Sequence, residues 1–223
     1  MKTILIIILI TISSVAFGQK HLVGIQGGLN ITNFTSTEGF GNKSARTGFL
    51  GGITYDYLLT EKYRVEVDIL YDQRGVVSKF FFTNDEGVYL GDEETKMSYD
   101  YLNVPIKFGY EVGNSTRLIP KIGIEPAFAI KAEINNPTFD ESGKVTGKES
   151  IDSKDYVSKF DFGGLAELGI ETDLSEKIIL SSNVNYKHSF TKFSNSKSDY
   201  FETLNMRHYG FSIAVGLKYM ISD

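Results

Sequence analysis

The segment Tyr209–Ile221 alternates strictly between large apolar residues and small or polar ones. One face of a strand would carry Tyr209, Phe211, Ile213, Val215, Leu217, Tyr219 and Ile221. The other face would carry His208, Gly210, Ser212, Ala214, Gly216 and Lys218. Successive side chains of a strand point to opposite sides, so the alternation predicts a strand with one apolar side. Its length fits a membrane-crossing strand, which needs about 9–11 residues.

The N-terminus predicts export. Lys2 precedes the apolar run Ile4–Ile12, and Ala16-Phe17-Gly18 offers the small residues of a cleavage site. The run is shorter than the roughly 20 apolar residues of a spanning helix, so we interpret residues 1–18 as a cleaved secretory signal and not as an anchor. No cysteine follows the run, which excludes a lipoprotein. Residues 19–223 are then expected to form one domain.

Composition narrows the class of protein. Gly (22), Tyr (13) and Phe (16) are plentiful and Pro (4) is scarce, which suits strands and turns. The lack of cysteine excludes disulfides and thiolate chemistry. The net charge of −5 argues against nucleic acid as a partner. Because no other stretch is long and apolar enough for a membrane helix, an exported chain of this kind is either soluble or a β-barrel.

Strand-like patterns recur along the whole chain. The predicted strands are Leu22–Thr32, Thr47–Leu58, Tyr63–Val76, Tyr99–Tyr110, Arg117–Lys131, Phe160–Glu171, Lys177–Phe190 and Arg207–Ile221. Short turns are expected at Leu59–Lys62, Glu111–Thr116 and Thr172–Glu176. Long polar connections are expected at Asn33–Arg46, Val77–Ser98, Ala132–Lys159 and Thr191–Met206. This alternation of lengths is typical of outer-membrane barrels, with short periplasmic turns and long extracellular loops.

The direction of the apolar faces separates two folds. A soluble, lipocalin-like barrel would bury its apolar face and is the competing architecture. Together the predicted apolar faces hold about three dozen large side chains, whereas a packed core of the TIM-barrel type holds about twelve. The surplus cannot fit inside an eight-stranded barrel. We therefore predict that the apolar faces contact lipid.

The interior then receives charged side chains of both signs. They are Arg64, Glu66, Asp68, Asp72, Arg74, Lys107, Lys121, Glu125, Lys131, Glu167, Glu171, Lys187 and Lys218. Buried charges are tolerated when they are paired, so we expect an ion-pair network that fills the bore. A proton or ion path is the alternative interpretation. A diffusion pore is not expected.

Aromatic residues gather near the ends of the predicted strands. They are Tyr55, Tyr57, Tyr63, Tyr71, Tyr110, Tyr186, Phe190, Tyr209 and Tyr219. This placement favours the two interfacial girdles of a membrane barrel, although aromatic residues are also favoured in strands generally. The C-terminal run Gly216–Ile221 is similar to the sorting signal of the outer-membrane assembly machinery, except that Ser222-Asp223 replaces a terminal aromatic residue.

One segment resembles a known family. Tyr101-Leu102-Asn103-Val104-Pro105-Ile106 resembles the Tyr-Leu-(Glu/Asn)-(Ile/Val)-Pro-(Leu/Ile) strand of the PorT-like outer-membrane β-barrel domain family of Gram-negative bacteria. Gly27–Asn30 and Gly210–Tyr219 are similar to that family's first and last strands. The resemblance implies a barrel without catalytic residues, and a few members take part in protein secretion and gliding. Pro105 lacks an N–H and is expected at a bulge or a weakly paired position.

Catalytic and metal-binding patterns are weak. A lipid A-modifying enzyme needs a serine and a base on one surface, yet His188 and Ser189 are neighbours on a strand and should point to opposite faces. His21 and His208 have no evident Ser or Cys partner, and zinc spacing is absent. The acidic runs are Asn84–Gly87 and Asp92–Glu94. They could collect a divalent cation, but they lack EF-hand spacing and a solvated loop is favoured. Gly48–Gly52 and Gly163-Gly164 precede no predicted helix and are not phosphate cradles.

These observations lead to one prediction: an all-β, eight-stranded antiparallel up-and-down transmembrane β-barrel in the outer membrane, monomeric and not an enzyme. No catalytic, cofactor or metal residues are assigned. The expected partners are lipid and lipopolysaccharide, the barrel-assembly machinery, and proteins at the extracellular loops Val77–Ser98 and Ala132–Lys159. The predicted role is structural or adhesive. The alternative is an accessory part of a secretion or envelope-assembly machine.

Overall fold

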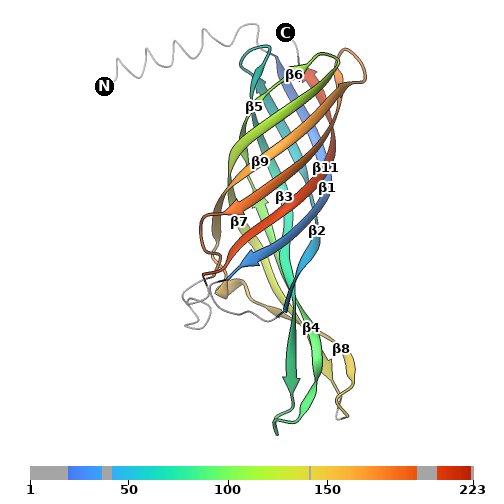
Figure 1. Cartoon of the computed structure of the whole chain (residues 1–223), viewed down its shortest axis with the longest axis vertical. Helices are drawn as coiled ribbons and strands as arrows, with labels where there is room; N and C mark the ends of the chain where they lie inside the picture. The colour runs from blue at the N-terminus through green and yellow to red at the C-terminus, as the bar shows by residue number, and fades with distance from the viewer. Residues whose placement is uncertain (1–19, 37–41, 141, 195–204, 222–223) are drawn as a thin grey trace, which may run out of the picture.

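The computed structural model describes residues 20–36, 42–140, 142–194 and 205–221. They form a tilted-strand barrel with a smaller sheet that projects from one end (Figure 1). The predicted signal peptide and the terminal Ser222-Asp223 lie outside the described residues. In the described ranges, no helix has the length and hydropathy of a membrane span.

The strands follow one another around the ring in chain order. They are β1 (His21–Thr35), β2 (Asn42–Leu58), β3 (Tyr63–Thr83), β4 (Tyr89–Asn103), β5 (Ile106–Tyr110), β6 (Val112–Gly113), β7 (Thr116–Phe139), β8 (Val145–Asp152), β9 (Phe160–Asp173), β10 (Ile178–Ser189) and β11 (Arg207–Ile221). A short 3-10 helix, η1, covers Lys154–Tyr156. Antiparallel pairing of β1 with both β2 and β11 closes the ring, so the predicted eight-stranded, up-and-down barrel is confirmed.

β4 and β5 form one wall of the barrel and are separated by Val104-Pro105. Pro105 sits at this break, as its missing N–H predicts. The backbone around the break keeps its hydrogen bonds, because the Asp68 N–H donates to the Pro105 carbonyl at 3.1 Å and the Val104 N–H donates to the Pro126 carbonyl at 2.9 Å. The family-like motif is therefore architectural: it interrupts a strand without leaving the wall open.

Along β11 the large apolar side chains point outward and the small or polar ones point into the bore, as predicted. Ile213 and Val215 are each 60% exposed, whereas Ser212 and Ala214 are each 2% exposed. The same arrangement holds around the ring. Large apolar side chains cover the outside of the barrel, and mostly polar ones fill the bore, together with some buried apolar residues such as Leu50, Ile119 and Ile179. A lipocalin-like interior is the reverse of this and does not occur.

Lys131 departs from the predicted interior set. On β7, Lys131 pairs with Asp100 but Ala129 already pairs with Tyr101, so Ile130 is an extra residue in a β-bulge. The bulge reverses the phase of the strand, and Lys131 points outward, where its ammonium lies 2.9 Å from Glu133. The prediction that Lys131 lines the bore is wrong for this reason.

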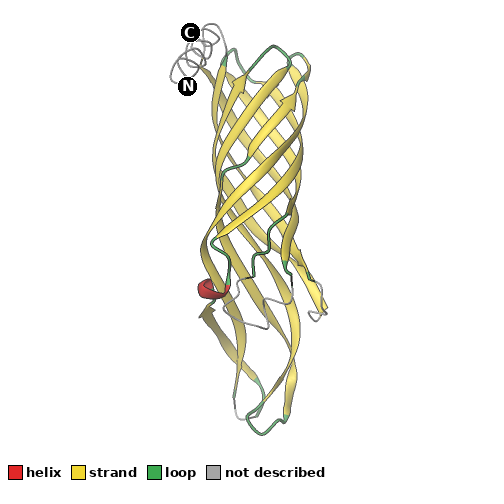
Figure 2. Cartoon of the chain, turned by 90° about the vertical axis from the view of Figure 1, so that its left-hand side faces the viewer, coloured by secondary structure: helices red, strands yellow, loops and turns green. Residues whose placement is uncertain are grey.

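Two of the predicted long connections are mostly strands. β3 has 21 residues and β7 has 24, about twice the length that crosses a membrane. Their outer halves continue beyond the ring and pair with β4 and β8 (Figures 1 and 2). Because the sequence predicts an outer-membrane barrel, and the long hairpins of such barrels lie outside the cell, we call this four-stranded part the extracellular sheet: residues 77–83, 89–97 and 133–139, and β8. Only its hairpin turns are loops.

Candidate functional sites in the bore and the extracellular sheet

Arg74 on β3 lies in the bore toward its extracellular end. Its guanidinium donates to Asp72 at 2.8 Å, to Asp161 at 2.8 Å and to Glu125 at 2.5 Å. The guanidinium also lies 4.7 Å from the ring centroid of Tyr101. Since these partners come from β4, β7 and β9 as well as β3, the side chain ties opposite walls together.

Glu66 organises the middle of the bore. It accepts hydrogen bonds from Lys121 at 2.5 Å and Lys218 at 2.9 Å, and it pairs with Lys107. Lys107 also reaches Asp68 at 2.8 Å. All these side chains are nearly inaccessible to solvent. Each ammonium thus meets carboxylates from more than one strand, which offsets the cost of removing the charges from water.

Arg64 closes the network at the periplasmic end. It lies 3.3 Å from Asp56 and 2.9 Å from Glu171, and it also pairs with Glu111. Beside it, Arg117 lies 2.6 Å from Asp173 at the mouth of the bore. These contacts complete a column of ion pairs that runs the length of the barrel.

The bore holds equal numbers of charges of each sign. The described buried residues facing it are Arg46, Arg64, Arg74, Lys107, Arg117, Lys121, Lys187, Lys218, Asp56, Glu66, Asp68, Asp72, Glu125, Asp161, Glu167 and Glu171. Every predicted interior charge except Lys131 is among them. The sequence-based set omitted Arg46, Asp56, Arg117 and Asp161, which the period-two phase of their strands would have identified.

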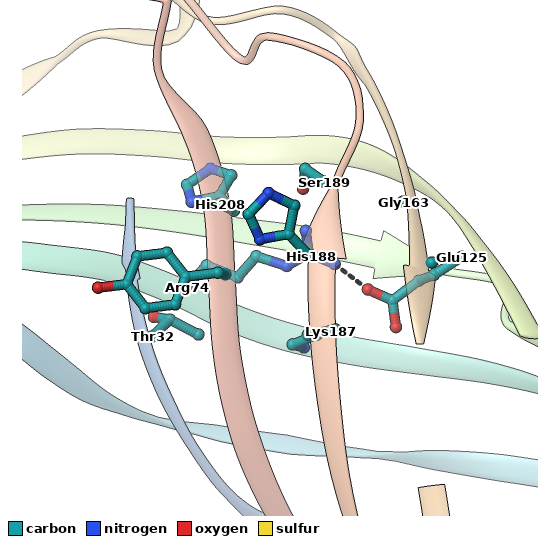
Figure 3. A pocket seen from close by; sticks show the side chains of 10 residues that line it. Thr32, Arg74, Glu125, Gly163, Lys187, His188, Ser189 and His208 are labelled. Atoms are coloured by element: carbon teal, nitrogen blue, oxygen red, sulfur yellow. Dashed lines mark hydrogen bonds and ion pairs between the residues drawn. The ribbon is translucent and has the colours of Figure 1, made fainter. Parts of the chain in front are cut away.

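Little open space remains inside. One cavity of about 10 Å³ lies beside Arg74, Glu125, Lys187 and His208 (Figure 3). A second, also about 10 Å³, lies deeper beside Gln26. Each has room for about one water molecule. In the described part of the chain, the bore is therefore a packed polar core rather than a passage for solutes.

An aromatic cluster covers the extracellular end of the bore. The ring of Phe193, from the connection after β10, stacks on His208 with centroids 4.0 Å apart. The Tyr101 hydroxyl lies 3.3 Å from His208 Nε2, and Tyr99 contacts the same imidazole edge-on. Phe34 packs edge-on against Phe193 from β1. His208 is thus enclosed by rings and belongs to the core.

His188 and Ser189 point to opposite faces, as their adjacency on β10 predicts. His188 is on the outside, where its Nδ1 lies 3.3 Å from the Tyr186 hydroxyl. Ser189 is inside and donates to Asp161 at 2.6 Å. His21 lies at the other end of the barrel, 2.7 Å from the Tyr55 hydroxyl. In the described ranges, no cluster of three or more His, Cys, Asp or Glu residues is arranged to hold a metal ion, and this includes both acidic runs of the sequence.

Two aromatic belts mark the limits of the membrane. At the periplasmic end, Tyr63 stacks on Phe108 at 5.7 Å. At the extracellular end, Tyr186 packs on Phe211 at 4.9 Å, and Phe128 and Phe160 pair at 5.4 Å. Exposed aromatic rings at both ends of an apolar surface are typical of the headgroup layers.

The extracellular sheet, which projects beyond the ring, exposes large apolar side chains. Phe81 is 74% exposed, Tyr89 60% and Val88 56%. They lie near the distal end of the β3–β4 hairpin. The side-chain oxygen of Asn84 stabilises the turn of this hairpin by accepting a hydrogen bond from the Val88 N–H at 2.8 Å. Exposed apolar side chains that lie close together are typical of binding surfaces.

The neighbouring hairpin has a similar turn. The Asp140 carboxylate accepts from the Ser142 hydroxyl at 2.6 Å and from the Lys144 N–H at 3.0 Å. These hydrogen bonds hold the pKa of Asp140 below its usual value. The two turns lie together, because a Cβ placed on Gly143 would meet Leu90 at 3.2 Å.

The extracellular sheet is also acidic. Residues 77–98 and 132–152 contain ten acidic and four basic residues. The bore is electrically balanced, so the negative charge of the molecule is concentrated on this projecting part.

Comparison with known proteins identifies the family. Residues 17–195 match the model of the outer membrane protein beta-barrel domain. The chain belongs to this family. It is therefore an outer-membrane β-barrel protein. In such barrels the long hairpins lie outside the cell and the short turns lie in the periplasm. The match is to the general family, and the narrower PorT-like resemblance stays a prediction.

Solved structures share the fold at low identity. OprG from Pseudomonas aeruginosa is 13% identical, with 92% of this chain and 97% of that chain covered and a TM-score of 0.50. A major outer membrane protein from Thermus thermophilus is 11% identical, with 91% and 99% covered and a TM-score of 0.52. These identities show the fold alone. No curated protein matches the chain at a significant level.

Proposed function

We propose that this protein is a non-enzymatic surface protein that binds a partner outside the cell through its extracellular sheet. The observation that carries the proposal is the exposure of Phe81, Val88 and Tyr89 beyond the outer aromatic belt. Exposing such side chains to water has a free-energy cost of about 25 cal/mol per Å² of apolar surface. A bound partner would recover that free energy. The rigid barrel supplies the scaffold on which the binding segment is held.

Export and assembly are part of the same proposal. Residues 1–18 would be removed before Gln19, and the barrel-assembly machinery would insert the remaining chain as a monomer surrounded by lipid and lipopolysaccharide. The apolar run Ile4–Ile12 and the alternation of β11 support these steps.

A second candidate is an accessory role in a secretion or envelope-assembly machine. The PorT-like motif Tyr101–Ile106 favours it. So does a hollow of about 450 Å³ at the periplasmic mouth, lined in part by Leu58, Leu59, Arg64 and Arg117. A machine component would bind its partner at that mouth rather than at the extracellular sheet.

Site-specific photo-crosslinking in intact cells separates the two roles. A photoreactive amino acid would replace Phe81 or Tyr89 on the extracellular sheet, and Leu59 on a periplasmic turn as the matched position. We expect crosslinked products at Phe81 and Tyr89 that external protease removes. Products at Leu59 alone would contradict the proposed function and support the machine.

A further inference from the structure

The outer edge of β8 has no strand beside it. β8 pairs with β7 from Glu133↔Asp152 to Phe139↔Val145, and among the described residues no other strand pairs with it. All eight of its residues are exposed. Its second edge therefore presents backbone N–H and C=O groups to water, and an extended peptide can add to such an edge.

β8 lacks two of the features that usually protect an edge strand, proline and a bulge near its centre, and its protection rests on the charges of Lys148, Glu149 and Asp152. It contains no proline, and its pairing with β7 is regular from Gly147 to Asp152. The register shift lies at the far end, between Thr138 and Phe139. Most exposed edges are instead short, bulged or interrupted by proline. The opposite edge of the same sheet is protected in another way, because β2 covers β3 as far as Lys79.

The side chains of β8 define what an added strand would carry. One face presents Gly147, Glu149 and Ile151 in turn. Val145 lies on the other face, because Thr146 is an extra residue in a bulge between the pairs Thr138↔Gly147 and Phe139↔Val145. Ile151 is 45% exposed. Residues directly opposite across a strand pair interact, so an apolar side chain fits opposite Ile151 and a basic one fits opposite Glu149. The excess of acidic residues over the whole sheet favours a basic segment as well.

We propose that the free edge of β8 binds an extended, basic segment of a partner protein, which adds to the extracellular sheet as a further antiparallel strand. This inference rests on the proposed function and names the mode of binding. Backbone hydrogen bonds would supply the affinity. Glu149 and Ile151, which share one face of β8, would supply the selectivity.

A second copy of the chain fits this edge less well. Two antiparallel copies of one strand are related by a two-fold axis perpendicular to the sheet, which centres the pairing on a residue. Within the regular part of β8, from Gly147 to Asp152, the two longest such registers are centred on Glu149 and on Ser150. The first places two carboxylates directly opposite one another, which is destabilising. Both bring two copies of an acidic sheet together.

The test uses the purified protein in lipid nanodiscs and a fluorescent peptide, Thr-Val-Thr-Arg-Thr-Thr. In the proposed register it lies along the regular part of β8, with its valine opposite Ile151 and its arginine opposite Glu149. Binding is followed by fluorescence anisotropy. We expect saturable binding that weakens at least about fivefold in Glu149→Lys. Binding should recover when the peptide's arginine is replaced by glutamate. Asp92→Lys, which makes the same charge change on β4, should have a smaller effect, and N-methylation of alternate peptide amides should abolish binding.

Several results would overturn the inference. These are no binding by the wild type, equal binding of the N-methylated peptide, or equal losses for Glu149→Lys and Asp92→Lys. If the wild type forms dimers and Glu149→Lys dissociates them, the strand that pairs with β8 is instead a second copy of the chain. Retained gel mobility of the folded barrel controls for misfolding. If crosslinks at Phe81 and Tyr89 persist while the peptide fails to bind, the proposed function stands and strand addition at β8 does not.

Discussion

The guanidinium of Arg74 on β3 lies 2.8 Å from the carboxylate of Asp161 on β9. The same carboxylate accepts hydrogen bonds from Ser189 at 2.6 Å and Thr191 at 2.7 Å. One buried ion pair therefore connects strands that are not neighbours in the ring. It shows how the interior holds the barrel together without an apolar core at this level.

Replacing Arg74 with methionine should strongly destabilise the barrel. Asp72, Glu125 and Asp161 would lose their common cation while staying buried, and breaking such a pair costs about 3–5 kcal/mol. Urea unfolding in lipid vesicles, followed by circular dichroism, measures the change. The matched control is Lys131→Met, because Lys131 points outward and its exposed ion pair is worth about 0–1 kcal/mol. Similar losses for both variants would contradict the assignment of the two faces.

Gly28 is expected to be essential for ring closure, whereas its neighbour Gly27 is not. A Cβ on Gly28 would lie 2.0 Å from the Ile213 carbonyl oxygen on β11, and a Cβ on Gly27 would touch the Phe49 ring at an ordinary 3.7 Å. Gly28→Ala should lower the free energy of unfolding by about 1–3 kcal/mol, because β1 and β11 must move apart to make room for the methyl group. Gly27→Ala should change the free energy of unfolding by no more than about 0.5 kcal/mol. The folded fraction on unheated gels reports both, and equal behaviour would count against this packing of the seam.

The bore should not conduct ions steadily. Its cavities beside Arg74 and Gln26 hold about 10 Å³ each, and the charges between them are paired. Phe193→Ala removes the aromatic ring that covers the extracellular mouth of the bore. The bore should still stay closed, because the ion pairs of Arg74 lie beneath that ring. Planar-bilayer recordings test this. Stable open-channel currents from the wild type would refute the packed interior.

The turn at Asp140 should be sensitive to acid. Its hydrogen bonds depress the pKa in the folded state. Their contribution to stability is therefore present above the unfolded pKa, near 3.9, and is lost as the pH falls through the folded pKa. Ser142→Ala removes the hydroxyl donor and should raise the pKa of Asp140 toward its ordinary value. NMR titration of the Asp140 carboxyl in nanodiscs measures the shift, and an unchanged pKa would show that the hydroxyl plays no part.

Period-two patterning was sufficient to predict the ring, the periplasmic ends of its strands and most of its interior charges. It worked because lipid on one side and a narrow bore on the other enforce the alternation at every position of β11. The outward position of Lys131 was not predicted because a bulge at Ile130 reverses the phase of the strand, and the sequence pattern does not reveal one inserted residue. The strands of the extracellular sheet were not predicted for a related reason. Outside the membrane nothing enforces alternation, so the consecutive Phe80-Phe81-Phe82 gave no strand signal.

Spin labelling along β11 tests the orientation of the two faces most directly. The chain contains no cysteine, so single cysteines can be introduced at each position from Phe211 to Leu217 and labelled with a nitroxide in lipid vesicles. We predict that labels at positions 211, 213, 215 and 217 collide readily with oxygen dissolved in the bilayer, and that labels at 212, 214 and 216 do not. Oxygen accessibility that peaks at the even positions, or that shows no period of two, would contradict the account.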